Sequence, residues 1–320
     1  MARQQKEQPR IPQDWALFAW QGVKVMVPPD WSPSALTGNY EEGYVRLDGP
    51  DQPRLEVKWA QSGKFVNIED VVQRYCKSLT KGREGKGVQT SESTKLSVKM
   101  PKDRSSVRFF SWRLDEEAYG AAWYCKTCGR VMLVQVLGQP GTGVDTLAEQ
   151  VLSSFEDHPE GDYLAWALYG FSCLAPKEFR LTGQRLLTGL LELDFENGRD
   201  KLKIVRWGLA NIALKDTDLE HWLRKESKKG WRNFHVILEP TDIHGHEGLA
   251  IAGPSAAPLV HLGAIALRMI GRKFPDVLRG AAWLCPQGNK IYHVEALIDP
   301  ADEGKVAVLV QSMVCHKEGA

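Results

Sequence analysis

Several features that define other protein classes are missing from this sequence of 320 residues. Six cysteines are too few for a disulfide scaffold in a chain of this length, so we expect free thiols or metal ligands. The 41 Lys and Arg residues against 40 Asp and Glu leave no basic excess for a phosphate backbone, which argues against nucleic acid as a partner. Residues 1–10 are polar and show no secretory signal, so we expect a cytoplasmic protein.

The sequence also has little that could insert into a membrane. Its most apolar stretch, residues 249–270, is interrupted by Pro254, Pro258, His261 and Arg268. A spanning helix needs about 20 predominantly apolar residues with few interruptions. We therefore expect no membrane insertion.

One stretch is present twice, as Gly-Ala-Ala-Trp-Tyr-Cys at residues 120–125 and as Gly-Ala-Ala-Trp-Leu-Cys at residues 280–285. A second match joins residues 57–59 to residues 205–207. The offset rises from 205 − 57 = 148 to 280 − 120 = 160, as loop insertions in two copies of one fold would produce. Two copies of about 150 residues can each form a core. The sequence therefore predicts a tandem duplication.

The predicted organisation has four parts. Residues 1–13 form a flexible tail, residues 14–157 the first copy, residues 158–162 a linker and residues 163–320 the second copy. Composition changes at each boundary, and the linker is polar and rich in charged residues.

Within each copy the hydrophobic pattern changes from alternation to helical spacing and back. In the first copy we expect strands at 23–27, 44–47, 55–59, 96–100, 107–114 and 121–136, a helix after Asn67, a mobile loop at 81–93 and a closing helix through 147–155. In the second we expect helices from Asp218 and through Val306 to Val314. The predicted fold class is α+β, with an antiparallel sheet and packed helices in each copy.

This order of elements resembles the fold shared by the PsbP and Mog1 families. The resemblance includes a first strand that begins with Gly and ends with Pro, as in Gly22 to Pro28 and Gly170 to Pro176. It covers residues 15–157 and 163–316. The resemblance implies an accessory or binding role in a larger assembly and brings no catalytic residues.

The second copy carries an additional apolar segment, residues 256–270. Its apolar residues occupy both sides of a helix, and such a helix must be buried somewhere. The second sheet, the first copy or a separate subunit could cover it. We therefore predict a protein partner or a homo-oligomer, with contacts through Leu259, Ile265, Leu267 and Met269.

The sharpest local motif is the pair Cys125 and Cys128, followed by Gly129. Two thiolates at this spacing form the knuckle that offers both sulfurs to one Zn²⁺. A structural zinc site needs four ligands, and the missing ones could come from Cys76, Cys173, Cys315 or His316, or from a symmetry-related chain. A redox dithiol and inert thiols are the alternatives, although a redox pair is expected at the start of a helix.

A second pair, His244 and His246, alternates about Gly245. On a strand, both imidazoles would project to the same side and could share a metal. A solvated loop turned by Gly245 is the simpler interpretation.

The sequence contains no nucleophile elbow, phosphate-binding loop or dinucleotide-binding fingerprint. The leading hypothesis is therefore a non-catalytic accessory or adaptor protein that acts through protein contacts. A zinc-binding or thiol-redox protein centred on Cys125 and Cys128 is the first alternative. A small-molecule binder with a pocket between sheet and helix is the second.

Overall fold

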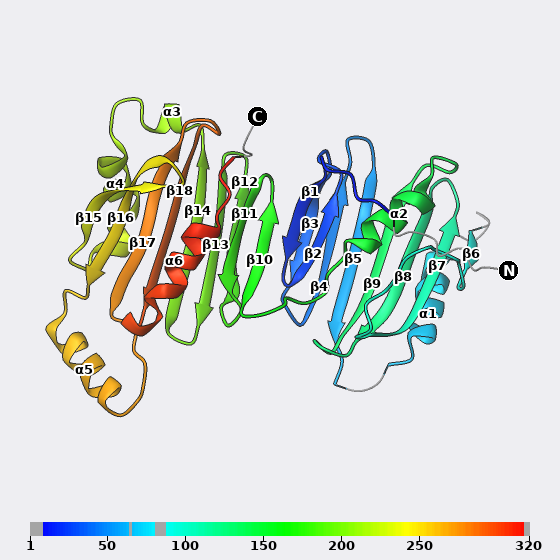
Figure 1. Ribbon diagram of the computed structural model, residues 1–320, viewed down its shortest axis with the longest axis horizontal. Helices are drawn as coiled ribbons and strands as arrows, with labels where there is room; N and C mark the ends of the chain where they lie inside the picture. The colour runs from blue at the N-terminus through cyan, green and yellow to red at the C-terminus, as the bar shows by residue number, and fades with distance from the viewer. Residues whose placement is uncertain (1–8, 64–65, 81–87, 317–320) are drawn as a thin grey trace. The chain divides into compact units, whose positions relative to one another are not determined.

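The computed structural model describes residues 9–63, 66–80 and 88–316. The chain divides into two compact units, the first comprising residues up to 161 together with 165–169, the second comprising 162–164 and the residues from 170 onward. Both are built mainly of antiparallel strands with helices packed on them, an α+β architecture (Figure 1). Most of the tail predicted at residues 1–13 lies outside the described residues. No helix of the described chain is both long and apolar enough to cross a membrane.

The first unit contains a seven-stranded antiparallel sheet in the order β3-β4-β5-β9-β8-β7-β6. An initial hairpin of β1 and β2 precedes it, with Leu17 opposite Met26. The elements are β1 Ala16–Trp20, β2 Val23–Val27, β3 Ser32–Gly38, β4 Glu42–Asp48, β5 Pro53–Gln61, α1 Ile68–Thr80, β6 Gln89–Ser91, β7 Arg104–Arg113, β8 Glu117–Cys125, β9 Arg130–Gly138 and α2 Val144–Ser153.

The two helices pack on opposite faces of this sheet. Side chains alternate between the two faces along a strand, so the residues of β8 show which helix covers which face. On β8, Ala118 and Ala122 belong to the core cluster that includes Ile68 of α1. Trp123 points to the other face and meets Phe155, just after α2, with ring centroids 5.4 Å apart. Cys125 has the same parity as Trp123. The cysteine therefore lies at the end of the strand, on the face that α2 covers.

Several predicted elements are confirmed. The hairpin of β4 and β5 is present, and Leu47 lies opposite Leu55. The amide of Glu69 donates to Asn67 Oδ1 at 3.1 Å, so Asn67 caps α1 as predicted. In the second unit the carboxylate of Asp218 accepts from a backbone amide of α4, Leu219–Trp231, in the same way.

The strand predicted at residues 96–100 is wrong. The amide of Ser97 donates to Glu149 Oε1 on α2 at 2.6 Å and is not part of a ladder. The edge strand is instead β6, at residues 89–91, inside the segment predicted as a loop. The alternation of Leu96, Val98 and Met100 is therefore not sufficient to form a strand, because a strand also needs a neighbouring strand with free hydrogen-bonding groups.

The second unit contains a seven-stranded antiparallel sheet in the order β12-β13-β14-β18-β17-β16-β15. Taken strand by strand, this order corresponds to that of the first sheet, from β3 and β12 to β6 and β15. The elements are β10 Tyr163–Leu168, β11 Phe171–Pro176, β12 Arg180–Leu187, β13 Leu190–Asn197, β14 Asp200–Gly208, α3 Ala210–Ala213, α4 Leu219–Trp231, β15 Ile237–Ile243, β16 His246–Pro254, α5 Pro258–Met269, β17 Val277–Cys285, β18 Lys290–Ile298, a 3₁₀ turn Pro300–Asp302 and α6 Glu303–Ser312.

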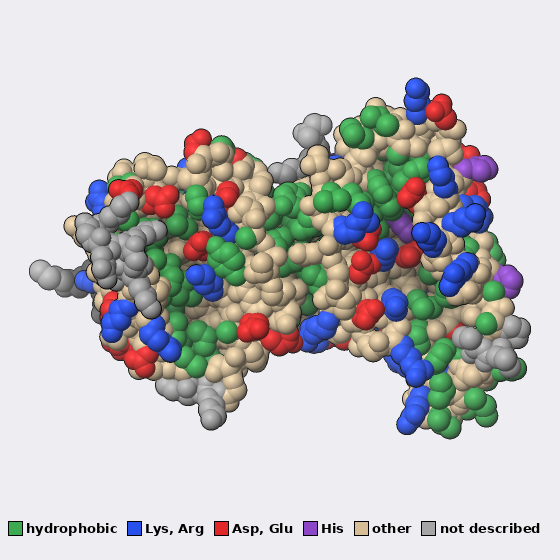
Figure 2. Space-filling view, turned by 180° about the vertical axis from the view of Figure 1, so that it is seen from behind, with side chains coloured by type: hydrophobic (Ala, Val, Ile, Leu, Met, Phe, Trp, Pro, Cys, Tyr) green, Lys and Arg blue, Asp and Glu red, His purple; other side chains and the backbone are tan. Residues whose placement is uncertain are grey.

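The additional helix of the second unit is present as α5. Figure 2 shows hydrophobic side chains gathered on the projecting lobe that α5 forms. Ile265 and Met269 are 43% and 83% exposed, Leu267 is half-buried, and the side chain of Leu259 lies outside the described residues. At the C-terminal end of α5, Arg268 Nε donates to Asp299 Oδ2 at 2.9 Å, which fastens the helix to its own unit. Among the described residues, part of the apolar surface of α5 is therefore left uncovered.

Candidate metal centre

The hairpin of β8 and β9 forms the knuckle expected for Cys125 and Cys128. Cys125 is the last residue of β8, and Cys128 lies in the turn that follows. Gly129 has φ of 71° and its amide donates to the carbonyl of Cys125 at 2.9 Å, so a glycine closes the turn. The amide of Cys128 lies 3.5 Å from Cys125 Sγ. The two sulfurs therefore face a common point.

Two further potential ligands arrive from the segment after α2. The amide of Glu156 donates to the carbonyl of Lys24 in an isolated β-bridge, which leads the next two residues, Asp157 and His158, to the hairpin. Cys125 Sγ lies 3.4 Å from His158 Nδ1, and the same nitrogen lies 3.2 Å from Asp157 Oδ1. One ligand atom from each of the four residues lies within 4.8 Å of the others.

This set of atoms could hold a metal ion. Thiolate, imidazole and carboxylate are the groups that bind Zn²⁺, and tetrahedral Zn–S and Zn–N bonds of about 2.3 and 2.0 Å place sulfur and nitrogen about 3.6 Å apart. The separation of 3.4 Å between Cys125 Sγ and His158 Nδ1 is close to that value. The remaining ligand atoms lie within 4.8 Å of one another, so only local shifts would be needed to complete a tetrahedron.

The surroundings of His158 favour the coordinating tautomer. Its Nε2 lies 3.5 Å from Asp103 Oδ2, and the same carboxylate oxygen lies 3.6 Å from Cys125 Sγ. A proton on Nε2 that is shared with this carboxylate leaves the lone pair of Nδ1 free for a metal. Metal-binding histidines usually have such a carboxylate or carbonyl behind them.

Asp157 is held as a buried carboxylate. Its side chain is 2% exposed, Trp123 Nε1 donates to Oδ2 at 2.6 Å, and a guanidinium nitrogen of Arg104 lies 3.5 Å from Oδ1. Burial opposes ionisation, but the charge of Arg104, the indole and His158 outweigh it and lower the pKa of Asp157. The carboxylate is therefore charged, and Oδ1 faces the cluster.

A second buried arginine supports Cys128. Arg130 is fully buried and donates to the carbonyl of Gln21 at 2.9 Å and to that of Asp157. Donation from the Cys125 thiol lowers the pKa of Cys128 to about 6, against the effect of burial, and Arg130 adds to the lowering. The same hydrogen bond and burial raise the pKa of Cys125. One thiolate is thus present near neutral pH, and a metal would displace the remaining proton.

The sequence did not identify the two partners of the cysteine pair. Asp157 was assigned to the end of the first copy and His158 to the linker. Among the proposed ligands, Cys76 packs in the core beneath α1, and Cys173 is buried in β11. All six cysteines are free. The only available signal was that an Asp-His pair directly follows the closing helix.

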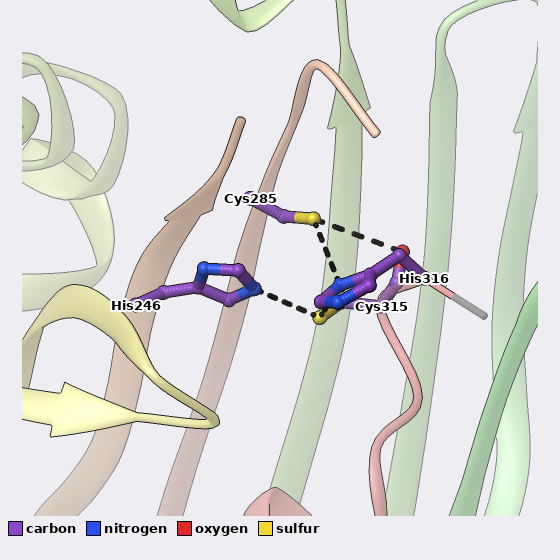
Figure 3. A group of neighbouring side chains, drawn as sticks. All are labelled: His246, Cys285, Cys315 and His316. Carbon is purple, nitrogen blue, oxygen red and sulfur yellow. Dashed lines mark hydrogen bonds between the residues drawn. The ribbon is translucent and has the colours of Figure 1, made fainter. Parts of the chain in front are cut away.

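Cys315 and His316, also considered as ligands, lie in the second unit, close to His246 and Cys285 (Figure 3). The favoured interpretation, a loop turned by Gly245, agrees with the structure, because His244 has φ of 57° and lies with Gly245 in the turn before β16. Its Nε2 contacts the carbonyl of Val310 at 2.8 Å. Only His246 reaches the cysteine cluster.

The second unit also has cavities where a small molecule could lie. One of about 460 Å³ lies between β16, β17 and α6, with Ile251, Ala281 and Val306 in its wall. Asp242, Arg279 and Glu303 supply the charged groups of the lining. These groups form no recognisable catalytic arrangement.

No protein-family model matches the chain, and no curated protein matches it. Seventeen solved chains do match. The solution structure of cyanobacterial PsbP (CyanoP) from Synechocystis sp. PCC 6803 has 15% identity and a TM-score of 0.34, covering 46% of this chain and 94% of that one. The immunity protein TplEi of Pseudomonas aeruginosa, solved with a peptide, has 6% identity and a TM-score of 0.30, covering 94% and 98%. A PsbP structure, from the family whose fold the order of elements resembles, is thus among the solved structures that the chain matches.

Proposed function

We propose that the protein is a non-catalytic accessory protein whose first unit binds one structural Zn²⁺ through Cys125, Cys128, Asp157 and His158. The observation that carries this proposal is the convergence of four ligand atoms within 4.8 Å of one another. The two buried arginines balance the negative charge that collects there when no metal is bound.

The proposed role is structural because the protein supplies all four positions of a tetrahedral shell. Catalytic zinc sites keep one position open for water or substrate, whereas structural sites are closed. The ion would link the turn between β8 and β9 to the segment that follows α2. It would therefore fix the end of the first unit against its sheet.

The redox alternative uses only Cys125 and Cys128. The cysteines lie on a hairpin and not at the start of a helix, where redox thiolates are commonly stabilised. His158 beside Cys125 could also stabilise a redox thiolate, but a dithiol would not use the carboxylate of Asp157. Metal binding accounts for all four groups, so we favour it.

The test is the metal content of the full chain purified without chelator, measured by inductively coupled plasma mass spectrometry. Cys128→Ser should lose the zinc of the first unit. Cys76→Ala is the matched control, because Cys76 is also a buried free cysteine of this unit but belongs to the α1 core. Equal zinc in wild type and Cys128→Ser would contradict the proposal.

A second function rests on the exposed apolar face of α5, which we propose as a protein-contact surface. Ile265 and Met269 are exposed, although Arg268 holds the helix in place. Apolar surface of this kind is typical of interaction sites. Sedimentation of the full chain should show less self-association, or less retention of a partner, for Met269→Asp than for wild type. Identical behaviour of both proteins would remove this function.

We further propose that the two units are tandem copies of one PsbP-like domain, which the corresponding strand orders support. The free state of all six cysteines suits a reducing compartment, so we propose that the protein is cytoplasmic. Recovery of the protein from an oxidising compartment on cell fractionation would contradict this location.

A further inference from the structure

The second unit contains its own cluster of cysteine and histidine side chains, drawn in Figure 3. Cys285 is the last residue of β17, His246 is the first of β16, and Cys315 and His316 follow α6. Their ligand atoms lie within 4.8 Å of one another. The cluster is local to this unit and shares no residue with the centre of the first.

The distances inside the cluster are those of a nearly assembled site. His246 Nε2 lies 3.3 Å from Cys315 Sγ, and His316 Nδ1 lies 3.2 Å from Cys315 Sγ and 3.5 Å from Cys285 Sγ. These values lie slightly below the sulfur to nitrogen separation of about 3.6 Å in tetrahedral zinc. His246, Cys285 and Cys315 are buried and His316 is half-buried.

We propose that these four residues form a second Zn²⁺ site, with two thiolates and two imidazoles as ligands. Two sulfurs and two nitrogens in a closed, mainly buried cluster are the donor set of structural zinc sites. Carboxylate is absent from the set, which disfavours Mg²⁺ and Ca²⁺. This proposal deepens the proposed metal-binding function but rests on separate residues.

A comparison with the first unit explains why the cysteine pair of one has no counterpart in the other. Gly288 stands where the second cysteine of the pair would be, and the fourth ligand comes from β16 instead. Gly248 lies opposite Trp283, so two residues further along the antiparallel register His246 comes opposite Cys285. In the first unit the residue opposite the corresponding cysteine is Arg104.

The two units also differ in the charged residues at matching positions of the cluster. In the first unit Arg104 forms a buried ion pair with Asp157. In the second unit, His246 stands at the position of the arginine and Cys315 at that of the aspartate, one residue before the histidine. The second unit therefore has two uncharged potential ligands where the first has an arginine and a carboxylate.

The segment that would carry Cys315 and His316 is already directed toward the cluster. The amide of Val314 donates to the carbonyl of Ser172 at 3.0 Å, and the hydroxyl of Tyr292 donates to the carbonyl of Cys315 at 3.0 Å. A bound ion would therefore fasten the chain after α6 to β16 and β17. Zinc would close the second unit as it is proposed to close the first.

The experiment compares His246→Gln with His244→Gln in the full chain. The two histidines are neighbours in one turn, but only His246 faces the cluster. Zinc per chain should be two in wild type and in His244→Gln, one in His246→Gln and in Cys128→Ser, and zero in the double variant His246→Gln/Cys128→Ser. Cobalt(II) added to Cys128→Ser should give tetrahedral ligand-field bands with thiolate charge transfer.

The two proposals fail in different ways. One zinc in wild type that is lost in Cys128→Ser and kept in His246→Gln overturns the second site alone. One zinc that is lost in His246→Gln and kept in Cys128→Ser supports the second site and overturns the first. If His246→Gln does not fold, His316→Gln replaces it, because His316 is only half-buried, and two zinc ions in folded His316→Gln would overturn the proposal.

Discussion

The buried ion pair beside the first centre offers a stringent test of its electrostatics. Arg104 and Asp157 have side chains that are each 2% exposed. Arg104→Met keeps much of the apolar volume but leaves the carboxylate without its cation. Loss of one partner of a buried pair costs about 3–5 kcal/mol. Trp123 still donates to Asp157 at 2.6 Å, so we expect the substitution to lower the free energy of unfolding of the metal-free protein by about 3 kcal/mol.

Zinc should reduce this cost. A divalent cation that binds Asp157 supplies the positive charge that Arg104→Met removes, and the ion is then the largest local charge. The loss of stability should therefore be smaller in zinc-loaded than in metal-free protein. The comparison thus reports whether the metal lies next to Asp157.

The pH dependence of stability gives an independent test of the same ion pair. The pKa of Asp157 is lowered in the folded state. The carboxylate therefore makes its full contribution to folding stability above its unfolded-state pKa, and this contribution is lost as pH falls through its folded-state pKa. Arg104→Met raises the folded pKa toward the unfolded one. The variant should accordingly show a weaker acid-dependent loss of stability than wild type.

The assay is native-state hydrogen exchange of the amides of β8 and β9, because two units need not unfold in a single transition. Arg108→Met is the matched control, since Arg108 lies on β7, as Arg104 does, and its contact with Glu69 at 3.6 Å is exposed. That change should cost about 0–1 kcal/mol. Equal effects of the two substitutions would refute the reasoning.

Three further predictions concern other parts of the chain. Gly129→Ala should destabilise the first unit by about 1–2 kcal/mol and weaken zinc binding, because φ is 71° and a Cβ would lie 2.7 Å from Gln61 Nε2; calorimetry with zinc titration measures both. Met269→Asp should change the free energy of unfolding by less than about 0.5 kcal/mol, since the side chain is 83% exposed, as measured by urea denaturation. Burial opposes ionisation of Asp299, but backbone amides and Arg268 lower its pKa, so the hydrogen-exchange protection factors of α5 should decrease as pH falls below the usual value for Asp of about 3.9.

Each of these has a clear contrary result. Unchanged stability and zinc affinity in Gly129→Ala would mean that the turn tolerates a side chain. A large loss of stability in Met269→Asp would make α5 ordinary core. Arg268→Met should remove most of the acid sensitivity of α5, and an equal sensitivity in that variant would show that Asp299 is not responsible.

The local chemistry of the first centre was readable from the sequence because its signal was local. The spacing of Cys125 and Cys128, with Gly129 behind them, predicted a hairpin knuckle, and the structure has one. Asp157 and His158 were not found, because the β-bridge of Glu156 with Lys24 brings them there and no pattern near the cysteines encodes it. Short motifs determine a turn, whereas a site assembled across the sheet depends on the whole topology.

The same reasoning explains the other differences. The alternation of residues 96–100 suggested a strand, but Glu149 of α2 takes the amide of Ser97. The histidine pair alternates in sequence, yet the positive φ of His244 separates the two imidazoles. In each case a distant partner or one backbone angle decides the local structure. Neither can be read from the periodicity of hydrophobic residues in the sequence.

The most direct test of the central claim is the zinc K-edge absorption spectrum of the His246→Gln chain, in which only the centre of the first unit should remain. Our account predicts a four-coordinate ion with two sulfurs at about 2.3 Å and two nitrogen or oxygen atoms at about 2.0 Å. A shell that contains only oxygen and nitrogen would show that Cys125 and Cys128 are not ligands and would contradict the account.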